Sequence, residues 1–341
     1  SICNCILDES SSTRELDEAL DAFAILCGDI SDIHPDRSFN AWADDALLAS
    51  GVAINPQAAA HCVFDYRRSV AFIRGVYAAI NNLKSRFPNP PIDILYAGCG
   101  PFATLLLPLL VKFTPGELKI TLLDMHQRSL DSVELLLSKF ALDAHSVCTK
   151  NRDACQYRHG EKIHLVIAET MQKSLEQEPQ FAVTANLAPQ LSADGLFIPQ
   201  QIEVELSLTD LEYEKKLVGQ SREIDPGVRE KRHPLATVFT LSPEGAVNQL
   251  HKGRYNALTK NLELNPTTVT IPSLANNARL DAVLFTRITV FEQYRLEDYE
   301  CEITLPLQCH ELAPLAGGEQ YRVAYQPGSY PKFTFARLHS K

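Results

Sequence analysis

The sequence predicts a mixed fold in three parts: N-terminal helices, a Rossmann-like doubly wound α/β domain, and a C-terminal antiparallel β barrel or sandwich. Apolar residues recur at helical spacing ahead of a proline cluster at 88–91. From 92 to about 200 apolar strands alternate with helical segments, which is typical of a mostly parallel sheet. Beyond that point, short stretches of alternating apolar and polar residues predict antiparallel strands. The expected domains are 1–88, 89–200 and 201–341.

The composition is that of a globular protein with a sizeable core. The sequence has 341 residues, no apolar run of membrane-spanning length and no signal-peptide pattern. Its net charge of −10 argues against nucleic acid as the main partner and suits a cationic substrate. Nine cysteines without a Cys-x-x-Cys pair indicate reduced thiols in a cytoplasmic protein, rather than a disulfide framework or a metal site.

The N-terminal part is expected to contain three helices. Ser12 and Glu15 form a capping-box pattern that begins a helix over about 13–27, and Gly28 closes it. A short helix is expected over 41–49. A longer one is expected from 56 to about 86.

The α/β part begins with a strand over 92–97, which runs into Gly98-Cys99-Gly100 and the expected first turn of a helix from Ala103. Glycines there let the backbone approach a ligand closely. The second strand, over 118–123, ends on Asp124, which is placed to accept hydrogen bonds from both hydroxyls of a ribose. The third glycine of the dinucleotide-binding pattern is missing, however, and the alternative is an ordinary α/β crossover in which Asp124 is simply solvated.

The remaining elements follow from the same periodicities. In the α/β part we expect helices over 127–140 and 181–191, with strands over 145–150, 163–168 and 196–198. In the C-terminal part we expect strands over 201–208, 235–241, 267–271, 282–291, 301–307, 320–325 and 332–337. The polar stretch 209–233 is interpreted as an excursion from the sheet, and a contact arm is one use for it.

Two acids follow the strand over 163–168. Glu169 stands just beyond its carboxyl end, where open α/β sheets bind ligands, and Glu178 follows nine residues later. That spacing does not put two side chains on one helix face, but a loop that returns on itself would bring them together. Two converging carboxylates suit a guanidinium, a planar cation with several donors. The alternative is that acids of this loop are simply solvated, which spacing alone leaves open.

These residues resemble a known family. The Gly-rich turn and Asp124 are similar to the nucleoside site of class I S-adenosylmethionine-dependent methyltransferases. The nine-residue double-E spacing, the run Asp65-Tyr66-Arg67-Arg68 and the segment 192–199 resemble the protein arginine methyltransferase family, most closely its symmetric-dimethylating (type II) branch. The resemblance covers about 60–205, and the β-rich remainder agrees with the family's barrel in texture only.

The resemblance implies S-adenosyl-L-methionine as the cofactor. The implied cofactor contacts are Arg68 to the carboxylate, the backbone of Gly98 and Gly100, Asp124 to the ribose, and Met125, Asp153 and the Ala154 N–H to the adenine. As catalytic residues, Glu169 and Glu178 would hold the acceptor guanidinium and align one nitrogen with the methyl group.

Two departures from the family pattern bear on the acceptor. The segment Tyr299-Glu300-Cys301-Glu302 stands where the family carries a Thr-His-Trp loop, and the only tryptophan is Trp42. The loop that runs from Glu169 to Glu178 is called the double-E loop here. In it, Gln172 replaces an expected glycine. We therefore expect a free small guanidine, with L-arginine first, rather than a protein substrate. Its charged ends would need added partners, for which the candidates are Glu300, Glu302, Arg287 and Arg295.

Other functions stay open on the sequence alone. The chain could be a protein arginine methyltransferase, or a natural-product methyltransferase acting on another nitrogen or oxygen. It could also be a catalytically silent subunit that keeps the cofactor site for interaction, although the presence of both glutamates argues against silence. A homodimer in the cytoplasm is expected, without nucleic acid or membrane as a partner.

Overall fold

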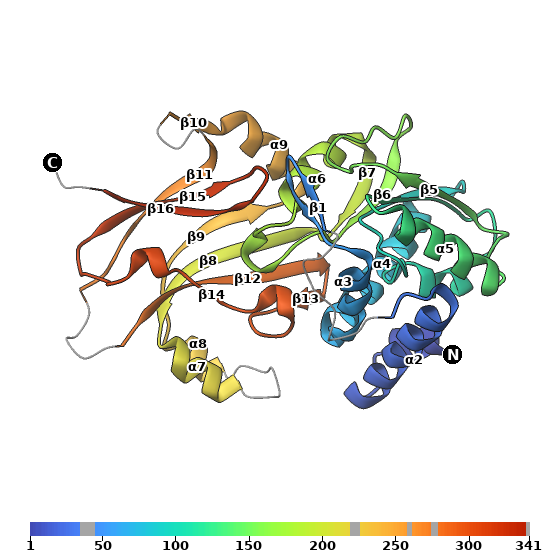
Figure 1. The fold of residues 1–341 in the computed structure, drawn as a ribbon, viewed down its shortest axis with the longest axis horizontal. Helices are drawn as coiled ribbons and strands as arrows, with labels where there is room; N and C mark the ends of the chain where they lie inside the picture. Colours follow the sequence, from blue (N-terminus) through green and yellow to red (C-terminus); the bar gives the residue numbers. More distant parts are fainter. Residues whose placement is uncertain (35–44, 219–225, 258–260, 274–278, 339–341) are drawn as a thin grey trace.

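The computed structural model describes residues 1–34, 45–218, 226–257, 261–273 and 279–338. In these ranges the chain forms N-terminal helices, a parallel sheet, two antiparallel sheets and a separate two-stranded hairpin. Figure 1 shows the parallel sheet with its helices on the right and the antiparallel strands on the left. The predicted fold class is confirmed.

The first predicted helix begins at its capping box. A short helix, α1 (Ile2–Leu7), precedes it, and α2 spans Thr13–Ser31. The Ser12 Oγ accepts from the Glu15 N–H at 3.3 Å, while the Glu15 carboxylate accepts from the Ser12 N–H at 2.8 Å. α2 continues past Gly28 because the left-handed residue that ends it is Asp32, at φ 56°.

The helix expected over 41–49 is wrong in its described part. β1 (Ala46–Leu48) and β2 (Gly51–Ala53) form an antiparallel hairpin instead. Gly51 has a φ of +146°, far outside the helical region, so the chain turns there rather than winding on. Residues 41–44, with Trp42, lie outside the described residues.

The long helix expected over 56–86 is divided. It consists of α3 (Pro56–His61), the 3₁₀ turn η1 (Cys62–Phe64) and α4 (Tyr66–Arg86). Asp65, at φ −81° and ψ 76°, leaves the helical region and gives α4 its own start. Arg68 is therefore in the first turn of α4.

The α/β part is a five-stranded parallel sheet in the order β5-β4-β3-β6-β7. Its strands are β3 (Ile92–Ala97), β4 (Leu118–Asp124), β5 (Ser146–Asn151), β6 (Ile163–Ala168) and β7 (Leu191–Ile198). Alternate residues of β3 face opposite layers: Ile94 packs in one core with α4 and α5 (Gln127–Lys139), and Leu95 in another with α6 (Gln180–Leu187). Both faces of the sheet are covered, as doubly wound folds require.

The helix expected directly after the Gly-rich turn is wrong. Residues 101–106 form turns, and a 3₁₀ helix, η2 (Leu107–Lys112), follows. A helix that began at Ala103 would carry Pro108 in its interior, where proline lacks the N–H donor and its ring clashes with the preceding turn. The Gly-rich turn is therefore not followed directly by an α-helix.

The C-terminal part contains two antiparallel sheets. The first has the order β13-β12-β8-β9, with β14 paired to β12, and consists of β8 (Gln201–Thr209), β9 (His233–Leu241), β12 (Asp281–Phe291), β13 (Tyr294–Leu296) and β14 (Leu307–Gln308). The second has the order β10-β11-β15-β16 and consists of β10 (Arg254–Asn256), β11 (Asn261–Thr270), β15 (Gln320–Gln326) and β16 (Lys332–Leu338). The sheets pack through aromatic side chains, with the rings of Phe239 and Tyr325 4.7 Å apart.

Helical segments connect these strands. The excursion over 209–233 contains α7 (Leu211–Val218) and α8 (Pro226–Arg229), and α9 (Pro243–Lys252) follows β9. The strand expected over 301–307 is wrong: the 3₁₀ turn η5 (Glu302–Thr304) lies within it, because Cys301 and Thr304 bond to each other and cap a turn. The remaining 3₁₀ turns are η3 (Lys173–Leu175), η4 (Ala188–Gln190) and η6 (His310–Leu312).

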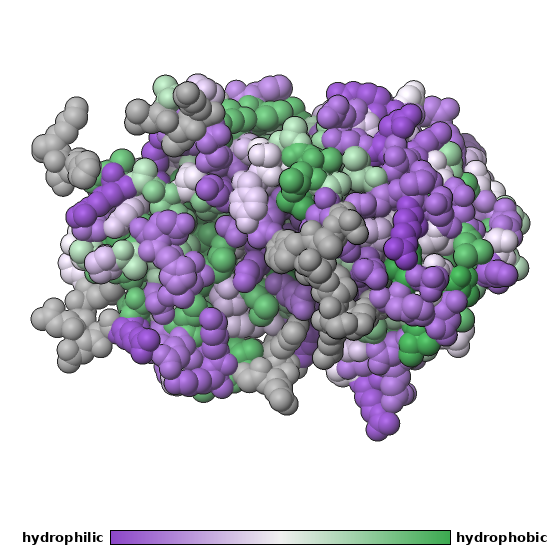
Figure 2. Space-filling view, in the orientation of Figure 1, coloured by the Kyte–Doolittle hydropathy of each residue, from purple (hydrophilic) through white to green (hydrophobic). Residues whose placement is uncertain are grey.

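Among the helices of the described ranges, none has the length and apolar character needed to cross a bilayer. The face of the molecule shown in Figure 2 is mostly hydrophilic, with apolar side chains in small patches. The apolar residues of the parallel sheet are instead buried between its helices.

Candidate active site

A pocket lies at the carboxyl ends of β3, β4 and β6, where the strand order of the parallel sheet reverses. It encloses about 960 Å³ of unfilled space, counting the part open to solvent. The cofactor-binding and catalytic residues predicted from the sequence all line this pocket: Arg68, Gly98, Gly100, Asp124, Met125, Asp153, Ala154, Glu169 and Glu178. Strand ends and one returning loop thus bring together residues that are 110 positions apart in the sequence.

The Gly-rich turn brings bare backbone to the pocket wall. Gly98 has a φ of +65°, and a Cβ at this position would lie 2.6 Å from the Thr170 Cγ2, so no larger residue fits without displacement. Next to it, the Gly100 N–H donates to the Asp124 Oδ2 at 2.9 Å. The turn and the tip of β4 are therefore fixed to each other.

Asp124 is held at the tip of β4 with its carboxylate buried. Its second oxygen, Oδ1, accepts from the His126 N–H at 2.8 Å, and only 8 % of the residue is exposed. Burial raises the pKa of Asp124, while the two backbone N–H bonds lower it. Each carboxylate oxygen can accept more than one bond, so capacity remains for hydroxyl donors from a ligand.

The loop after β5 forms the wall on the other side of Asp124. The Asp153 carboxylate accepts from the Cys155 N–H at 2.8 Å, and the Ala154 carbonyl accepts from Asn186 Nδ2, also at 2.8 Å. Asn151 Nδ2 donates to the Met125 carbonyl at 2.8 Å. These bonds fix the backbone at Met125, Asp153 and Ala154, the three residues predicted to contact the adenine.

The double-E loop returns on itself, as the spacing of its acids requires. Three of its residues, Ser174, Leu175 and Gln177, have left-handed backbone at φ 55°, 56° and 64°. Such strained residues persist only when their surroundings hold them. The antiparallel sheets do so: Tyr325 Oη donates to the Leu175 carbonyl at 2.9 Å, and the Ser174 N–H donates to Thr286 Oγ1 at 2.9 Å.

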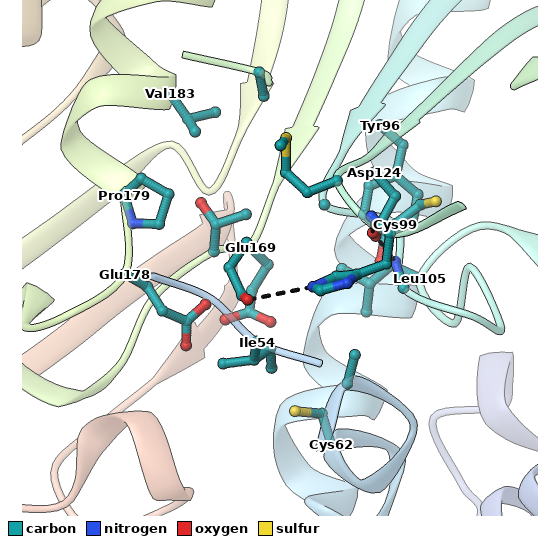
Figure 3. A pocket seen from close by; sticks show the side chains of 18 of the residues that line it. Ile54, Cys62, Tyr96, Cys99, Leu105, Asp124, Glu169, Glu178, Pro179 and Val183 are labelled. Atoms are coloured by element: carbon teal, nitrogen blue, oxygen red, sulfur yellow. Dashed lines mark hydrogen bonds between the residues drawn. The ribbon is translucent and has the colours of Figure 1, made fainter. Parts of the chain in front are cut away.

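The loop directs both carboxyl groups into one pocket, which Figure 3 shows from close by. Glu169 accepts a hydrogen bond from Arg68 Nη2 through its Oε2, and the two side chains are only 7 % and 11 % exposed. The other oxygen, Glu169 Oε1, is buried and has no hydrogen-bond partner among the described residues. A buried carboxylate oxygen without a donor is costly, so this atom is an acceptor ready for a ligand.

Glu178 lies beside this unsatisfied oxygen. It is 7 % exposed, and its Oε1 accepts from Gln172 Nε2 at 2.8 Å. Burial, followed by the negative charge of Glu169, raises the pKa of Glu178 to about 8. From the sequence, Gln172 is only a departure from a family pattern, whereas in the structure it orients Glu178.

Glu300 does not line the pocket, and neither do the other residues suggested for the ends of a free amino acid: Glu302, Arg287 and Arg295. The Glu300 carboxylate accepts from the Glu297 N–H at 2.7 Å and pairs with Arg67 Nη1 at 3.7 Å. The Glu302 N–H donates to the Asp65 carboxylate at 2.9 Å. The segment thus packs against the start of α4, because the Glu300 carboxylate pairs with Arg67 and the Glu302 backbone bonds to Asp65.

The hairpin β1–β2 contributes to the pocket although sequence analysis missed it. Leu48, Val52, Ala53 and Ile54 are among the lining residues. The signal that could have revealed it is Ser50-Gly51 between two pairs of apolar residues, which favours a tight turn over a helix.

The chain was compared with known proteins. No protein-family model matches the sequence, and no curated protein matches it. Among solved structures, the Trypanosoma brucei PRMT1 enzyme-prozyme heterotetrameric complex with AdoHcy is similar over 82 % of this chain and 96 % of that chain, with 11 % identity and a TM-score of 0.45. Coclaurine N-methyltransferase bound to N-methylheliamine and SAH is similar over 38 % of this chain and 35 % of that chain, with 16 % identity and a TM-score of 0.27. Neither likeness is close enough to establish a function.

Proposed function

We propose that this protein is an S-adenosylmethionine-dependent N-methyltransferase that acts on a guanidino group. The observation that carries the proposal is the pair Glu169 and Glu178, two buried carboxyl groups directed into a pocket that Asp124 and the Gly-rich turn close from the other side (Figure 3). A nucleoside-type wall and a cation-binding wall therefore share one pocket.

The residues on the first wall fit the cofactor. Gly98 leaves a space that any Cβ would fill, and Asp124 keeps acceptor capacity for a ribose diol. Arg68 offers further guanidinium N–H groups, besides the one bound to Glu169, for a carboxylate. S-Adenosylmethionine would supply an electrophilic methyl group; the chain's own residues would hold the cofactor and exclude water.

The second wall fits a guanidinium as the acceptor. The free Glu169 Oε1 and the Glu178 carboxylate would each accept an N–H of this planar cation, which fixes its orientation as well as its charge. Methylation of a guanidinium releases one proton. Glu178 is suited to accept it, because burial and Glu169 already raise the pKa of its carboxyl group to about 8.

Within this class we propose a free small guanidine as the acceptor, with L-arginine first. The apolar residues Leu48 and Val52 of the hairpin line the pocket together with Glu178, which suits the methylene chain of a small acceptor.

The homodimer and the cytoplasmic location stay predictions, as does the use of α7 and α8 as a contact arm.

Cofactor binding is expected to depend on Asp124. Asp124→Ala should weaken the binding of S-adenosylhomocysteine by about 1–3 kcal/mol, the scale of hydrogen bonds to a charged group. Isothermal calorimetry measures the change. Asp131→Ala, which removes an exposed acid of α5 that accepts a hydrogen bond from Gln127, is the matched control and should bind like the wild type. If the wild type binds neither S-adenosylmethionine nor S-adenosylhomocysteine, the proposed function is wrong.

The acceptor is expected to be identified by mass spectrometry after incubation with S-adenosylmethionine. The panel contains L-arginine, small guanidines, simple amines and arginine-containing peptides. We expect a gain of one methyl group on a guanidine nitrogen, and a higher kcat/KM for free L-arginine or a close analogue than for any peptide. Faster methylation of peptide arginine would overturn the small-acceptor proposal, and methylation of amines alone would overturn the guanidino proposal.

A further inference from the structure

We infer that the β1–β2 hairpin is the acceptor-side wall of the pocket and that Gly51 is a positioning residue for Glu178. The inference rests on the proposed function, since it concerns the acceptor half of the same site. In Figure 1 the hairpin, labelled β1, lies between the parallel sheet and the antiparallel strands. It contacts the double-E loop, which carries the proposed acceptor-binding residue Glu178.

The hairpin bonds to the double-E loop next to Glu178. The Val52 N–H donates to the Gln177 carbonyl at 2.8 Å. At Gly51 the two backbones touch: an added Cβ would lie 2.8 Å from the Gln177 carbonyl oxygen, 2.8 Å from the Pro179 nitrogen and 2.9 Å from the Glu178 carbonyl carbon. These atoms belong to backbone and cannot rotate away, so only glycine permits the contact.

The opposite side of the hairpin reaches the cofactor wall. His126, two residues beyond Asp124, places its Nε2 3.3 Å from the Ala53 carbonyl oxygen. At the base, Asp45 Oδ1 accepts from the N–H and the side-chain Nδ2 of Asn55, at 2.7 and 3.0 Å. The hairpin thus spans the pocket from the tip of β4 to the double-E loop and touches both halves of the site.

This arrangement makes the position of Glu178 depend on the hairpin. A two-stranded hairpin is marginally stable by itself, so these contacts keep it in place. The Glu178 carboxyl group accepts a hydrogen bond from Gln172 in its own loop, and its backbone rests on Gly51. A displacement of reacting groups by about 1 Å lowers a rate on the order of 10²-fold, so a small shift here affects turnover more than cofactor affinity.

The test compares two glycine-to-alanine variants. Gly51→Ala puts a methyl group into the Gln177–Pro179 backbone. Gly116→Ala has the same type of backbone strain, at φ +94°, but its Cβ meets nothing within 4 Å. With L-arginine and an arginine peptide as acceptors, Gly51→Ala should lower kcat/KM at least about 10-fold, with S-adenosylhomocysteine affinity within about threefold of wild type. Gly116→Ala should resemble the wild type in both.

Hydrogen exchange gives a second readout that needs no turnover. Gly51→Ala and Val52→Pro, which removes the N–H donor to Gln177, should both speed amide exchange over 172–180 relative to Gly116→Ala, and leave the β6 amides unchanged. Unchanged exchange over 172–180, or equal loss of cofactor binding and turnover, would overturn the inference. A wild type that binds no S-adenosylhomocysteine overturns the proposed function instead, and the exchange data still decide the role of the hairpin.

Discussion

Glu169→Gln and Glu178→Gln should each lower turnover by at least about 10²-fold while S-adenosylhomocysteine still binds. At about pH 9, where the Glu178 carboxyl group is ionised, a glutamine keeps the shape of the side chain but removes the negative charge that orients the guanidinium and stabilises its developing positive charge. Loss of one such preorganised electrostatic contact typically lowers kcat on the order of 10²–10³-fold. Single-turnover kinetics with L-arginine measures the effect, and calorimetry checks that the cofactor half is intact.

Glu176→Gln is the matched control, because Glu176 belongs to the same loop but does not line the pocket. It should turn over at nearly the wild-type rate. If Glu178→Gln did so as well, the convergence of the two acids would have no catalytic meaning. Equal loss of activity in all three variants would instead point to a general disturbance of the loop.

The pH dependence separates Glu178 from Glu169. Its raised pKa means that the free enzyme carries a neutral carboxyl group at Glu178 below about pH 8 and a carboxylate above it. The kcat/KM for a guanidinium acceptor should therefore rise between about pH 7 and 9 and lose this rise in Glu178→Gln. Stability should change in the opposite sense. Folding raises this pKa from 4.5 to about 8. As the pH rises from 4.5 to about 8, the wild type therefore loses stability relative to Glu178→Gln.

The fold was predictable where periodicity and burial agree. β3, β4 and β6 are nearly continuous apolar runs, and such runs in an α/β protein are buried on both faces. The same strands end at the residues that line the pocket, so Gly98, Asp124 and Glu169 could be placed from the sequence alone. For parallel strands, the position of a side chain along the strand determines where it lies in the site.

Other parts depend on contacts that a sequence pattern does not reveal. The alanines and leucines around 46–49 favour a helix, but Gly51 packs on the backbone of the double-E loop and the chain forms a hairpin instead. Glu300 was proposed for the pocket from its place along the chain. In the structure Glu300 bonds to the Glu297 N–H and pairs with Arg67, and this contact across 233 residues is one that no local pattern encodes.

A large effect on stability is expected from Arg232, which lies at the end of the excursion between β8 and β9. Its guanidinium bonds Glu214 in two places, at 2.8 and 3.0 Å, and Asp298 at 2.5 Å, and it stacks 3.6 Å from the centre of the Phe285 ring. The Arg232 side chain is 2 % exposed, and those of its acidic partners are 1 % and 0 % exposed. This network attaches α7 and α8 to the first antiparallel sheet.

Arg232→Ala should lower the free energy of unfolding by about 3–5 kcal/mol, because it leaves two carboxylates buried with a cation removed from between them. Denaturant unfolding followed by circular dichroism measures the loss. Arg14→Ala removes an arginine from an ion pair with Glu18 whose side chains are 87 % and 62 % exposed, and should change stability by no more than about 0.5 kcal/mol. A loss below about 1 kcal/mol for Arg232→Ala would mean that water reaches the network and replaces the lost guanidinium. The expected loss is large because the neighbouring cations are already paired with other acids: Arg287 bonds to Asp298 and Glu205, and Arg229 pairs with Asp298, so the buried Glu214 loses its guanidinium partner.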